Sequence, residues 1–388
     1  MTNRITILGS TGSIGVSTID VIGQLGEGYA VDALSGNGNI ELLASQARQT
    51  RARLAVTADE SRYHDLKQAL SGTGIEAAAG RSGLAEAADG DASLVMAAIV
   101  GTAGLAPTLA AAKRGANIAL ANKECLVSAG DLFIRAVEDG GGTLIPVDSE
   151  HNAIFQVLNE HHRHALERII LTASGGPFRT WTREAMANVT AATARAHPNW
   201  SMGLKISIDS ASMFNKALEM IEAKHLFDVR PEQIEVIVHP QSVIHSMVGY
   251  ADGSVLAQLG CPDMRTAIGY ALSFPTRPTL NVERLDFTKL ARLDFEAPDE
   301  DRFPALRLAR VAMERGGLQG AVLNAAKEVA LEAFIEGRIG FLEMADITGM
   351  VMDHMAGLPA ASSMEDVFAS DAEARRQAKA LIDTRAAA

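Results

Sequence analysis

A regularly spaced set of glycines near the N-terminus constrains the fold more than any other feature of the sequence. Gly9, Gly12 and Gly15 recur at every third position, after the strand-like run Arg4–Leu8 and before a helical pattern. Small residues at such a junction let a pyrophosphate approach the backbone, and the helix N-terminus supplies unpaired N–H groups. The spacing is GxxGxxG, for which a purely structural turn is the alternative interpretation. The strand-to-helix context favours dinucleotide binding.

Strand-like runs alternate with helical stretches over residues 1–148. This alternation predicts parallel strands joined by right-handed crossovers, with helices on both faces of the sheet. The expected fold class is therefore α/β, beginning with a doubly wound, Rossmann-like nucleotide-binding domain. The predicted strands cover residues 4–8, 30–34, 53–57, 93–99, 117–121 and 143–147.

The pattern changes after this sheet, and we expect three further parts. These are an α+β catalytic or connective domain over residues 149–273, a linker over 274–304 and a helical bundle over 305–388. Asp252-Gly253 predicts a hairpin turn, and apolar spacing predicts one long helix over 206–227. The expected strands are 169–173, 234–238, 243–250 and 254–259, and the expected bundle helices are 305–315, 321–335, 341–355 and 364–382.

Charge and cysteine content exclude several classes of protein. With 35 basic and 47 acidic residues, the 388-residue chain has a net charge of −12, which repels nucleic acid and anionic lipid. Residues 93–112 are uncharged, but Pro107 and many small residues indicate a buried strand and helix, not a membrane span. Two cysteines and no signal-peptide pattern predict a cytoplasmic protein. The charge and the lack of a membrane span predict that it has no nucleic-acid or membrane partner.

The end of the second predicted strand bears on the choice of dinucleotide. NAD-selecting folds place an acidic residue there, on the ribose 2′-OH. The segment Leu34–Asn39 contains no carboxylate. The space left for a 2′-phosphate favours NADP, with Ser35, Asn37 and Asn39 as hydrogen-bond donors.

Two carboxylates follow the last predicted strand of the sheet. Asp148 and Glu150 stand two positions apart, where open α/β sheets hold their ligands. Hard oxygen ligands suit Mg²⁺ or Mn²⁺, not zinc. The alternative is that Asp148 or Ser149 caps the helix that follows.

A second polar cluster lies within the predicted helix over 206–227. Asn215 and Glu219 are four residues apart and Lys216 and Glu219 are three apart, so the three share one helix face. With Ser210 and Ser212 nearby, the donors around one cation suit a phosphate monoester. A solvated salt bridge is the alternative.

Several shorter patterns leave a choice between function and ordinary structure. Residues 174–177 read as a phosphate-binding turn or a plain loop, and residues 197–203 as a mobile flap or a plain loop. A YxxxK pair, Tyr63 and Lys67, lies too early in the chain to reach a nicotinamide, so we interpret it as a solvated helix face. His245 is expected to be a core histidine, and His239 carries only a weak functional signal.

Taken together, the motifs resemble those of the 1-deoxy-D-xylulose 5-phosphate reductoisomerase family over about residues 4–350. In chain order they are GSTGSIG, ANKE, PVDSEHNAIFQ, SGGPF, HPNWSMG, KISIDSASMFNKALE and HPQSVIHSMV. The resemblance implies an NADPH domain, a catalytic domain, a linker and a C-terminal helical bundle, usually as a homodimer in the bacterial cytoplasm or in plastids.

The resemblance also implies roles for individual residues. Asp148, Glu150 and Glu219 would be the metal ligands. The catalytic residues would be these three and Lys123. The substrate phosphate would contact Ser174, Ser210, Asn215 and Lys216. The hydroxyl end of the substrate would contact Ser149, Lys123 and His197, with Trp200 and Met264 at its border. Glu150 and Glu219 would also belong to the substrate-binding residues. The cofactor would contact Thr11, Gly12, Ser13, Ile14, Gly36, Asn37, Gly38, Asn39, Asn122, Lys123, Glu124 and Gly203. The family often has Lys or Arg where Gly38 stands.

The implied reaction is isomerisation of 1-deoxy-D-xylulose 5-phosphate and NADPH-dependent reduction to 2-C-methyl-D-erythritol 4-phosphate. The implied cofactors are NADPH and a divalent metal, Mg²⁺, Mn²⁺ or Co²⁺. One alternative is another NAD(P)-linked reductase, which would need no metal. The other is a non-catalytic nucleotide sensor that binds the cofactor without oxidising it.

Overall fold

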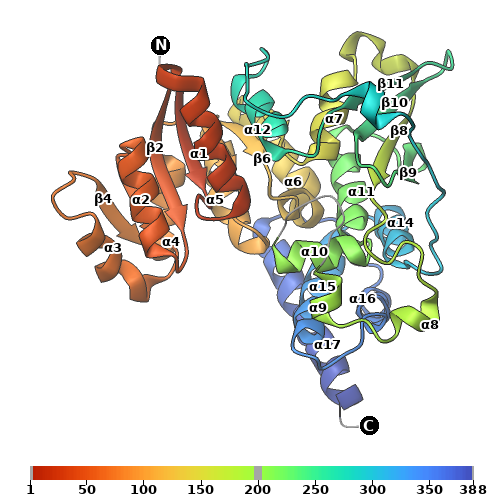
Figure 1. The fold of residues 1–388 in the computed structure, drawn as a ribbon. Helices are drawn as coiled ribbons and strands as arrows, with labels where there is room; N and C mark the ends of the chain where they lie inside the picture. The colour runs from red at the N-terminus through yellow and green to blue at the C-terminus, as the bar shows by residue number, and fades with distance from the viewer. Residues whose placement is uncertain (1–2, 196–202, 387–388) are drawn as a thin grey trace. The chain divides into compact units, whose positions relative to one another are not determined.

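The computed structural model describes residues 3–195 and 203–386, which belong to two compact units (Figure 1). Unit 1 comprises Met1–Cys125, Phe133–Phe155 and Asp263–Arg284. Unit 2 comprises Leu126–Leu132, Gln156–Pro262 and Leu285–Ala388. The four-part division expected from the sequence stays a prediction. Among the described residues, no helix combines the length and apolar character that a membrane crossing requires.

Unit 1 is built on a seven-stranded, wholly parallel sheet in the order β4-β3-β2-β1-β5-β6-β7. The doubly wound prediction is confirmed, and every strand expected in this region is present. One further strand, β4, was not predicted, because its sequence Glu-Ala-Ala-Ala contains no β-branched or aromatic residue. The strands are β1 (Asn3–Leu8), β2 (Tyr29–Gly36), β3 (Leu54–Thr57), β4 (Glu76–Ala79), β5 (Leu94–Ala97), β6 (Asn117–Leu120) and β7 (Leu144–Pro146).

Helices surround this sheet and complete the core of unit 1. Ile5, Ile7 and Leu34 are fully buried, and each such side chain contributes about 1.5–3 kcal/mol through loss of contact with water. From outside the first 155 residues, Ile268 and Leu272 of α12 pack into the same core. The helices are α1 (Ser13–Leu25), α2 (Ile40–Thr50), α3 (Tyr63–Ala69), α4 (Gly80–Asp89), α5 (Leu105–Lys113), α7 (Ser149–Val157) and α12 (Met264–Ser273). Helix α6 (Glu124–Gly140) is shared between the units, because its residues Leu126–Leu132 belong to unit 2.

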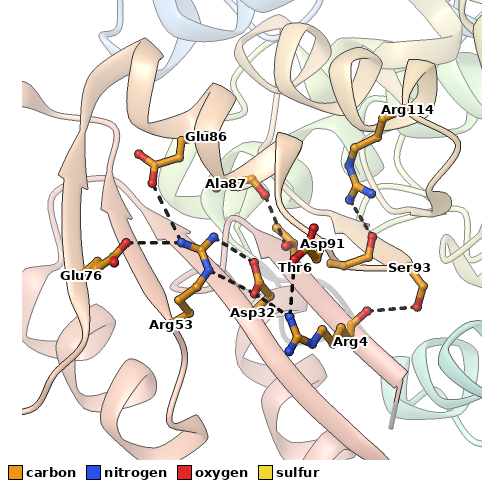
Figure 2. A network of polar contacts seen from close by, with 11 residues as sticks. Arg4, Thr6, Asp32, Arg53, Glu76, Glu86, Ala87, Asp91, Ser93 and Arg114 are labelled. Atoms are coloured by element: carbon orange, nitrogen blue, oxygen red, sulfur yellow. Dashed lines mark hydrogen bonds and ion pairs between the residues drawn. The ribbon is translucent and has the colours of Figure 1, made fainter. Parts of the chain in front are cut away.

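A polar network centred on Asp32 ties together the amino-terminal side of this sheet (Figure 2). Arg53 donates to both carboxylate oxygens of Asp32, through Nε at 3.3 Å and Nη2 at 3.1 Å. Arg53 also contacts Glu76 and Glu86, and Arg4 of β1 approaches Asp32 at 4.0 Å. Through Arg53, the residue that precedes β3, and Asp32 of β2, the network joins β1, β2, β4 and α4.

Unit 2 contains a four-stranded sheet in the order β11-β10-β8-β9. β10 is antiparallel to β8 and β11, whereas β8 and β9 are parallel, so this sheet is mixed. The Asp252-Gly253 hairpin is confirmed, because the Tyr250 N–H donates to the Ser254 carbonyl across the turn. The strands are β8 (Leu166–Ala173), β9 (Ile234–Val238), β10 (Ile244–Tyr250) and β11 (Val255–Leu259).

The prediction of one helix over 206–227 is wrong, because the segment forms two helices that separate at Met213. Met213 has a φ of 64°, a left-handed conformation that no α-helix continues through. Apolar residues keep helical spacing on both sides, which hides the break in the sequence. The C-terminal helical region is confirmed. The helices of unit 2 are α8 (Arg183–Met186), α9 (Ala191–Ala194), α10 (Leu204–Ala211), α11 (Phe214–Leu226), α13 (Phe287–Leu290), α14 (Ala305–Arg315), α15 (Gln319–Ile335), α16 (Glu343–His354) and α17 (Met364–Ala386). Short 3₁₀ helices occur in unit 1 at Gly26–Gly28, Glu60–Arg62 and Thr102–Gly104, and in unit 2 at Glu160–Ala165 and Pro231–Gln233.

Candidate active site

Four loops of unit 1 carry most of the residues expected to bind cofactor and metal. Each loop follows the carboxyl end of a parallel strand, so the sheet brings them to one edge. The strand order reverses between β1 and β5, which is where doubly wound folds bind dinucleotides. The loops hold Thr11–Ile14 after β1, Gly36–Asn39 after β2, Asn122–Glu124 after β6 and Asp148–Glu150 after β7.

The turn between β1 and α1 leaves no room for a side chain at two of its three regularly spaced glycines, Gly9 and Gly15. Gly9 has a φ of +92°, and a Cβ there would lie 2.6 Å from the Ala98 carbonyl oxygen. A Cβ at Gly15 would lie 2.3 Å from the Cα of Ser10. Gly12, the residue before α1, provides no side-chain cap for the helix. The first-turn N–H groups are thus left for an anion, as a pyrophosphate site requires.

Two side chains from β2 and α2 hold this turn in place. The Ser35 Oγ accepts a hydrogen bond of 2.9 Å from the Gly9 N–H. Its hydroxyl proton is not used in that bond, so donation to a 2′-phosphate stays a prediction. Ser10 Oγ donates to Gln46 Oε1 at 2.8 Å, and Gln46 Nε2 donates to the Ser10 carbonyl at 2.9 Å. Gln46 was not predicted to have this role, because its only signal in the sequence is a polar residue among the buried Leu43, Ala44 and Ala47 of α2.

The loop after β2 is held against the end of β3. Thr57 Oγ1 donates to the Asn37 carbonyl at 2.7 Å, and the Ala58 N–H donates to the Gly36 carbonyl at 2.8 Å. Asn39 Oδ1 caps α2 by accepting from the Leu42 N–H. The Asn39 amide group therefore keeps its nitrogen as a hydrogen-bond donor. Gly38 has open space around the position of a Cβ.

Asn122 links two of the loops along this edge. Its Nδ2 donates to the carbonyls of Ile99 and Gly101, the latter at 2.9 Å, and its Oδ1 accepts from the Cys125 N–H at 3.1 Å. The side chain therefore fixes the loops after β5 and β6, which positions the neighbouring Lys123.

Lys123 and Asp148 form an ion pair at the carboxyl ends of β6 and β7. Lys123 Nζ lies 2.7 Å from Asp148 Oδ2, and both side chains are largely buried. The other oxygen of Asp148 accepts from the Glu150 N–H at 3.4 Å, so Asp148 also begins α7. Ser149 Oγ donates to the Glu150 carboxylate. Helix capping and ligand binding are therefore compatible here, because Asp148 uses separate oxygens.

In unit 2, the first turns of α11 hold a fully buried carboxylate. Glu219 has no exposed surface, and it accepts hydrogen bonds from Lys216 Nζ and Asn215 Nδ2. A solvated salt bridge is excluded, because Lys216 is buried as well. Burying these charges costs free energy unless they are paired, so the fold maintains this cluster through specific pairing within α11.

The turn after β8 packs directly on the end of α10. A Cβ at Gly176 would lie 3.0 Å from the Ala211 Cα and 3.2 Å from the Ser210 carbonyl oxygen. Ser174 Oγ accepts from the Gly176 N–H at 3.1 Å and so shapes this turn. The turn containing Ser174 and the helix end containing Ser210 are thus neighbours within unit 2.

The remaining expected site residues divide into three groups. Gly203 precedes α10 and is exposed, and Met264 begins α12 and packs against the core of unit 1. His197 and Trp200, with the rest of the expected flap before Gly203, lie outside the described residues.

The two patterns interpreted as structural, His245 and the YxxxK pair, agree with that interpretation, and His239, which carries only a weak functional signal, is bonded within the core. His239 is fully buried, with Nδ1 2.9 Å from the Asp294 carbonyl and Nε2 accepting from the Val243 N–H. His245 is buried in β10. Lys67 is exposed on α3, with its Nζ 5.7 Å from the centre of the Tyr63 ring.

Comparison with protein-family models gives three matches that cover different parts of the chain. Residues 5–130 match the model described as 1-deoxy-D-xylulose 5-phosphate reductoisomerase. Residues 144–227 match the C-terminal domain model of the same description, and residues 259–377 match the DXP reductoisomerase C-terminal domain.

Curated proteins and solved structures give the same result over nearly the whole chain. The chain is 74% identical over 384 residues to the 1-deoxy-D-xylulose 5-phosphate reductoisomerase of Rhizobium rhizogenes, covering 98% of this chain and 97% of that one. The Zymomonas mobilis reductoisomerase in complex with NADPH superposes with a TM-score of 0.93 at 55% identity, covering 98% and 99% of the two chains. A DOX-P reductoisomerase with NADPH, fosmidomycin and magnesium gives a TM-score of 0.94 at 42% identity, covering 98% of each chain.

Proposed function

Because the chain belongs to the 1-deoxy-D-xylulose 5-phosphate reductoisomerase family, we propose the roles below for the residues that its two units position. The resemblance stated from the motifs is confirmed. The enzyme converts 1-deoxy-D-xylulose 5-phosphate to 2-C-methyl-D-erythritol 4-phosphate with NADPH and a divalent metal. The alternatives of a metal-independent reductase and a nucleotide sensor are therefore set aside.

The β1–α1 turn fits the pyrophosphate of NADPH. Its support is the close backbone approach at Gly9 and Gly15 and the uncapped start of α1. We assign the dinucleotide contacts to Thr11–Ile14, with the loop Gly36–Asn39 at the ribose 2′-phosphate. Asn122, Lys123, Glu124 and Gly203 complete the cofactor contacts in this assignment.

The metal ligands are Asp148 and Glu150 from unit 1 and Glu219 from unit 2. The observation that carries this assignment is the fully buried Glu219 carboxylate, whose charge the fold maintains with Lys216. All three residues offer only oxygen donors, which suits Mg²⁺ and Mn²⁺. When bound, the ion supplies Lewis-acid stabilisation of negative charge that develops on substrate oxygens.

Lys123 is assigned to the reacting end of the substrate. The Asp148 carboxylate at 2.7 Å holds its ammonium group in one position. An ammonium group so placed donates a hydrogen bond to a substrate oxygen and holds a proton where negative charge develops. Ser149 and His197 contact the hydroxyl groups in this assignment, and Trp200 and Met264 border the substrate.

The substrate phosphate binds Ser174, Ser210, Asn215 and Lys216. The packing of the Gly176 turn against the end of α10 supports this assignment, because it makes the turn that contains Ser174 a neighbour of the helix end that contains Ser210. Phosphate binding anchors a group that does not react and so orients the short carbon chain for the rearrangement.

The enzyme acts as a homodimer in the cytoplasm and also accepts Mn²⁺. β11 is an edge strand of the unit 2 sheet, and its Val255 and Leu256 side chains are exposed. An exposed apolar edge favours pairing with a second chain, and a symmetric dimer closes such an edge. The low cysteine content agrees with a reducing compartment.

NADPH oxidation by chelator-treated enzyme tests this account. Substrate should cause oxidation only after Mg²⁺ or Mn²⁺ is added, and parallel assays with NADH measure how the loop around Gly38 affects cofactor choice. Oxidation that persists in metal-free enzyme would overturn the metal assignment. Bound NADPH with no oxidation under any condition would restore the nucleotide-sensor alternative.

A further inference from the structure

A buried ion pair in unit 2 lies outside the residues assigned so far. Lys327 Nζ of α15 is 2.8 Å from Asp209 Oδ2 of α10, and the two residues are only 3% and 9% exposed. Two charges removed from water are costly, and replacing them with apolar residues is often neutral or stabilising. Stability is therefore a weak explanation for this pair.

The pair acts at the end of α10 that faces the proposed phosphate site. Asp209 directly precedes Ser210, and its carbonyl accepts from Ser212 Oγ at 3.3 Å. The next residue, Ala211, contacts the Gly176 turn. A shift of Asp209 would therefore move Ser210 relative to the turn that carries Ser174.

The other partner, α15, is itself fixed by α17. Glu328, next to Lys327, accepts from Arg375 Nη2, while Arg375 Nε donates to Asp371 at 2.7 Å. Asn324 Nδ2 also donates to Glu328 at 3.2 Å. The contacts with α17 thus fix the part of α15 that carries Lys327, and Lys327 in turn contacts α10.

A second ion pair between the same two helices provides a natural control. Lys205 Nζ of α10 lies 2.8 Å from Glu332 Oε1 of α15, but these side chains are 58% and 54% exposed. Exposed pairs of this kind contribute about 0–1 kcal/mol. Positional control of α10 should therefore depend on the buried pair.

We propose that Lys327 and Asp209 are positioning residues for substrate phosphate binding. Their ion pair holds the end of α10 so that Ser210 lies within reach of the phosphate. This inference rests on the proposed assignment of Ser210 to the phosphate.

The test compares Asp209→Asn and Lys327→Met in the full-length enzyme. Each variant should raise both the KM for the substrate and the inhibition constant of inorganic phosphate by about ten-fold, a change of about 1.4 kcal/mol. The KM for NADPH and kcat should stay close to the wild-type values. Lys327→Arg, which keeps the charge, should recover part of the phosphate affinity.

Further variants separate positioning from stability. Lys205→Met breaks the exposed pair and should leave the KM for the substrate unchanged. Val329→Ala removes buried methyl groups from α15 and should lower Tm without weakening phosphate binding. Should a single variant fail to fold, Asp209→Asn combined with Lys327→Met removes both charges and should fold with weak phosphate binding.

Two results would overturn the inference. One is wild-type phosphate inhibition in folded Asp209→Asn or Lys327→Met, and the other is equally weak binding in Val329→Ala. Ser210→Ala tests the underlying assignment separately. Weakened phosphate binding in Ser210→Ala, with wild-type binding in the Lys327 and Asp209 variants, would reject the positioning role alone.

Discussion

Lys123 Nζ lies 2.7 Å from Asp148 Oδ2, so one ion pair joins the carboxyl ends of β6 and β7 at the nucleotide-binding edge of unit 1. Neither residue could occupy this position without the parallel sheet, because 25 residues separate them in the sequence. The pair brings an ammonium group to the carboxylate that we assign to the metal. Unit 1 alone therefore positions the ammonium group that we assign to the reacting end of the substrate.

Lys123→Met should lower kcat by about 100-fold, the contribution typical of a positioned proton donor. NADPH affinity, measured by cofactor fluorescence, should fall less than kcat, because Lys123 is only one of the assigned cofactor contacts and the pyrophosphate turn after β1 keeps its own residues. The matched control is Lys113→Met, at an exposed position in α5, which should behave as wild type. A wild-type kcat for Lys123→Met would contradict its role.

Gly12→Ala and Gly15→Ala should separate cofactor binding from folding. A Cβ at Gly12 meets only the Gly9 carbonyl at 3.5 Å, whereas one at Gly15 would lie 2.3 Å from the Ser10 Cα. Gly12→Ala should therefore keep its Tm but bind NADPH more weakly, because the methyl group occupies the approach to α1. Gly15→Ala should lose both Tm and affinity. Unchanged NADPH affinity in Gly12→Ala would place the pyrophosphate elsewhere.

Asp32→Asn should destabilise the protein without affecting the reaction. The Asp32 side chain is buried and accepts two hydrogen bonds from Arg53, and bonds to charged groups contribute about 1.5–3 kcal/mol each. Because the network lies away from the edge that binds ligands, kcat should be unchanged. Urea unfolding and steady-state kinetics measure the two effects. A large loss of kcat at an unchanged free energy of unfolding would refute this interpretation.

His225 should make the protein less stable in acid. Burial lowers the pKa of His225 below its ordinary value of 6.5, and the nearby Asp131 offsets this only in part. Below pH 6.5 the unfolded chain therefore binds this proton more readily than the folded protein does. The free energy of unfolding falls as the pH drops below this value, and this contribution is fully present above it.

Urea unfolding above and below pH 6.5 measures the effect. His225→Gln should show a smaller loss of stability in acid than wild type, whereas His161→Gln, at an exposed position, should match wild type. An identical acid dependence in His225→Gln would show that this histidine does not contribute.

The features predictable from the sequence are those with a local signal. The glycine spacing after β1 identifies the nucleotide turn, and the positions of Asp148 and Glu150 after β7 place them at its edge. Both depend on short segments that directly follow a predicted strand, and that position favours ligand binding over the alternative roles of the same residues. The hairpin at Asp252-Gly253 was predictable for the same reason.

The missed features depend on contacts distant in the sequence or on one backbone angle. Gln46 holds the nucleotide turn across 36 residues, and Lys327 meets Asp209 across 118. At Met213 a single left-handed residue divides two helices whose apolar spacing continues. The contact in which Ser35 accepts from the Gly9 N–H also joins residues far apart in the sequence. Polarity alone does not distinguish a ligand contact from an internal one.

Manganese binding to metal-free protein, followed by the EPR signal of free Mn²⁺, tests the central claim that Glu219 joins Asp148 and Glu150 in holding the ion. Wild type should bind one ion per chain, and Glu219→Gln should bind it at least about ten-fold more weakly while keeping its NADPH affinity. Glu232→Gln, at an exposed position, should bind as wild type. Wild-type manganese affinity in Glu219→Gln would contradict the assignment of the metal site.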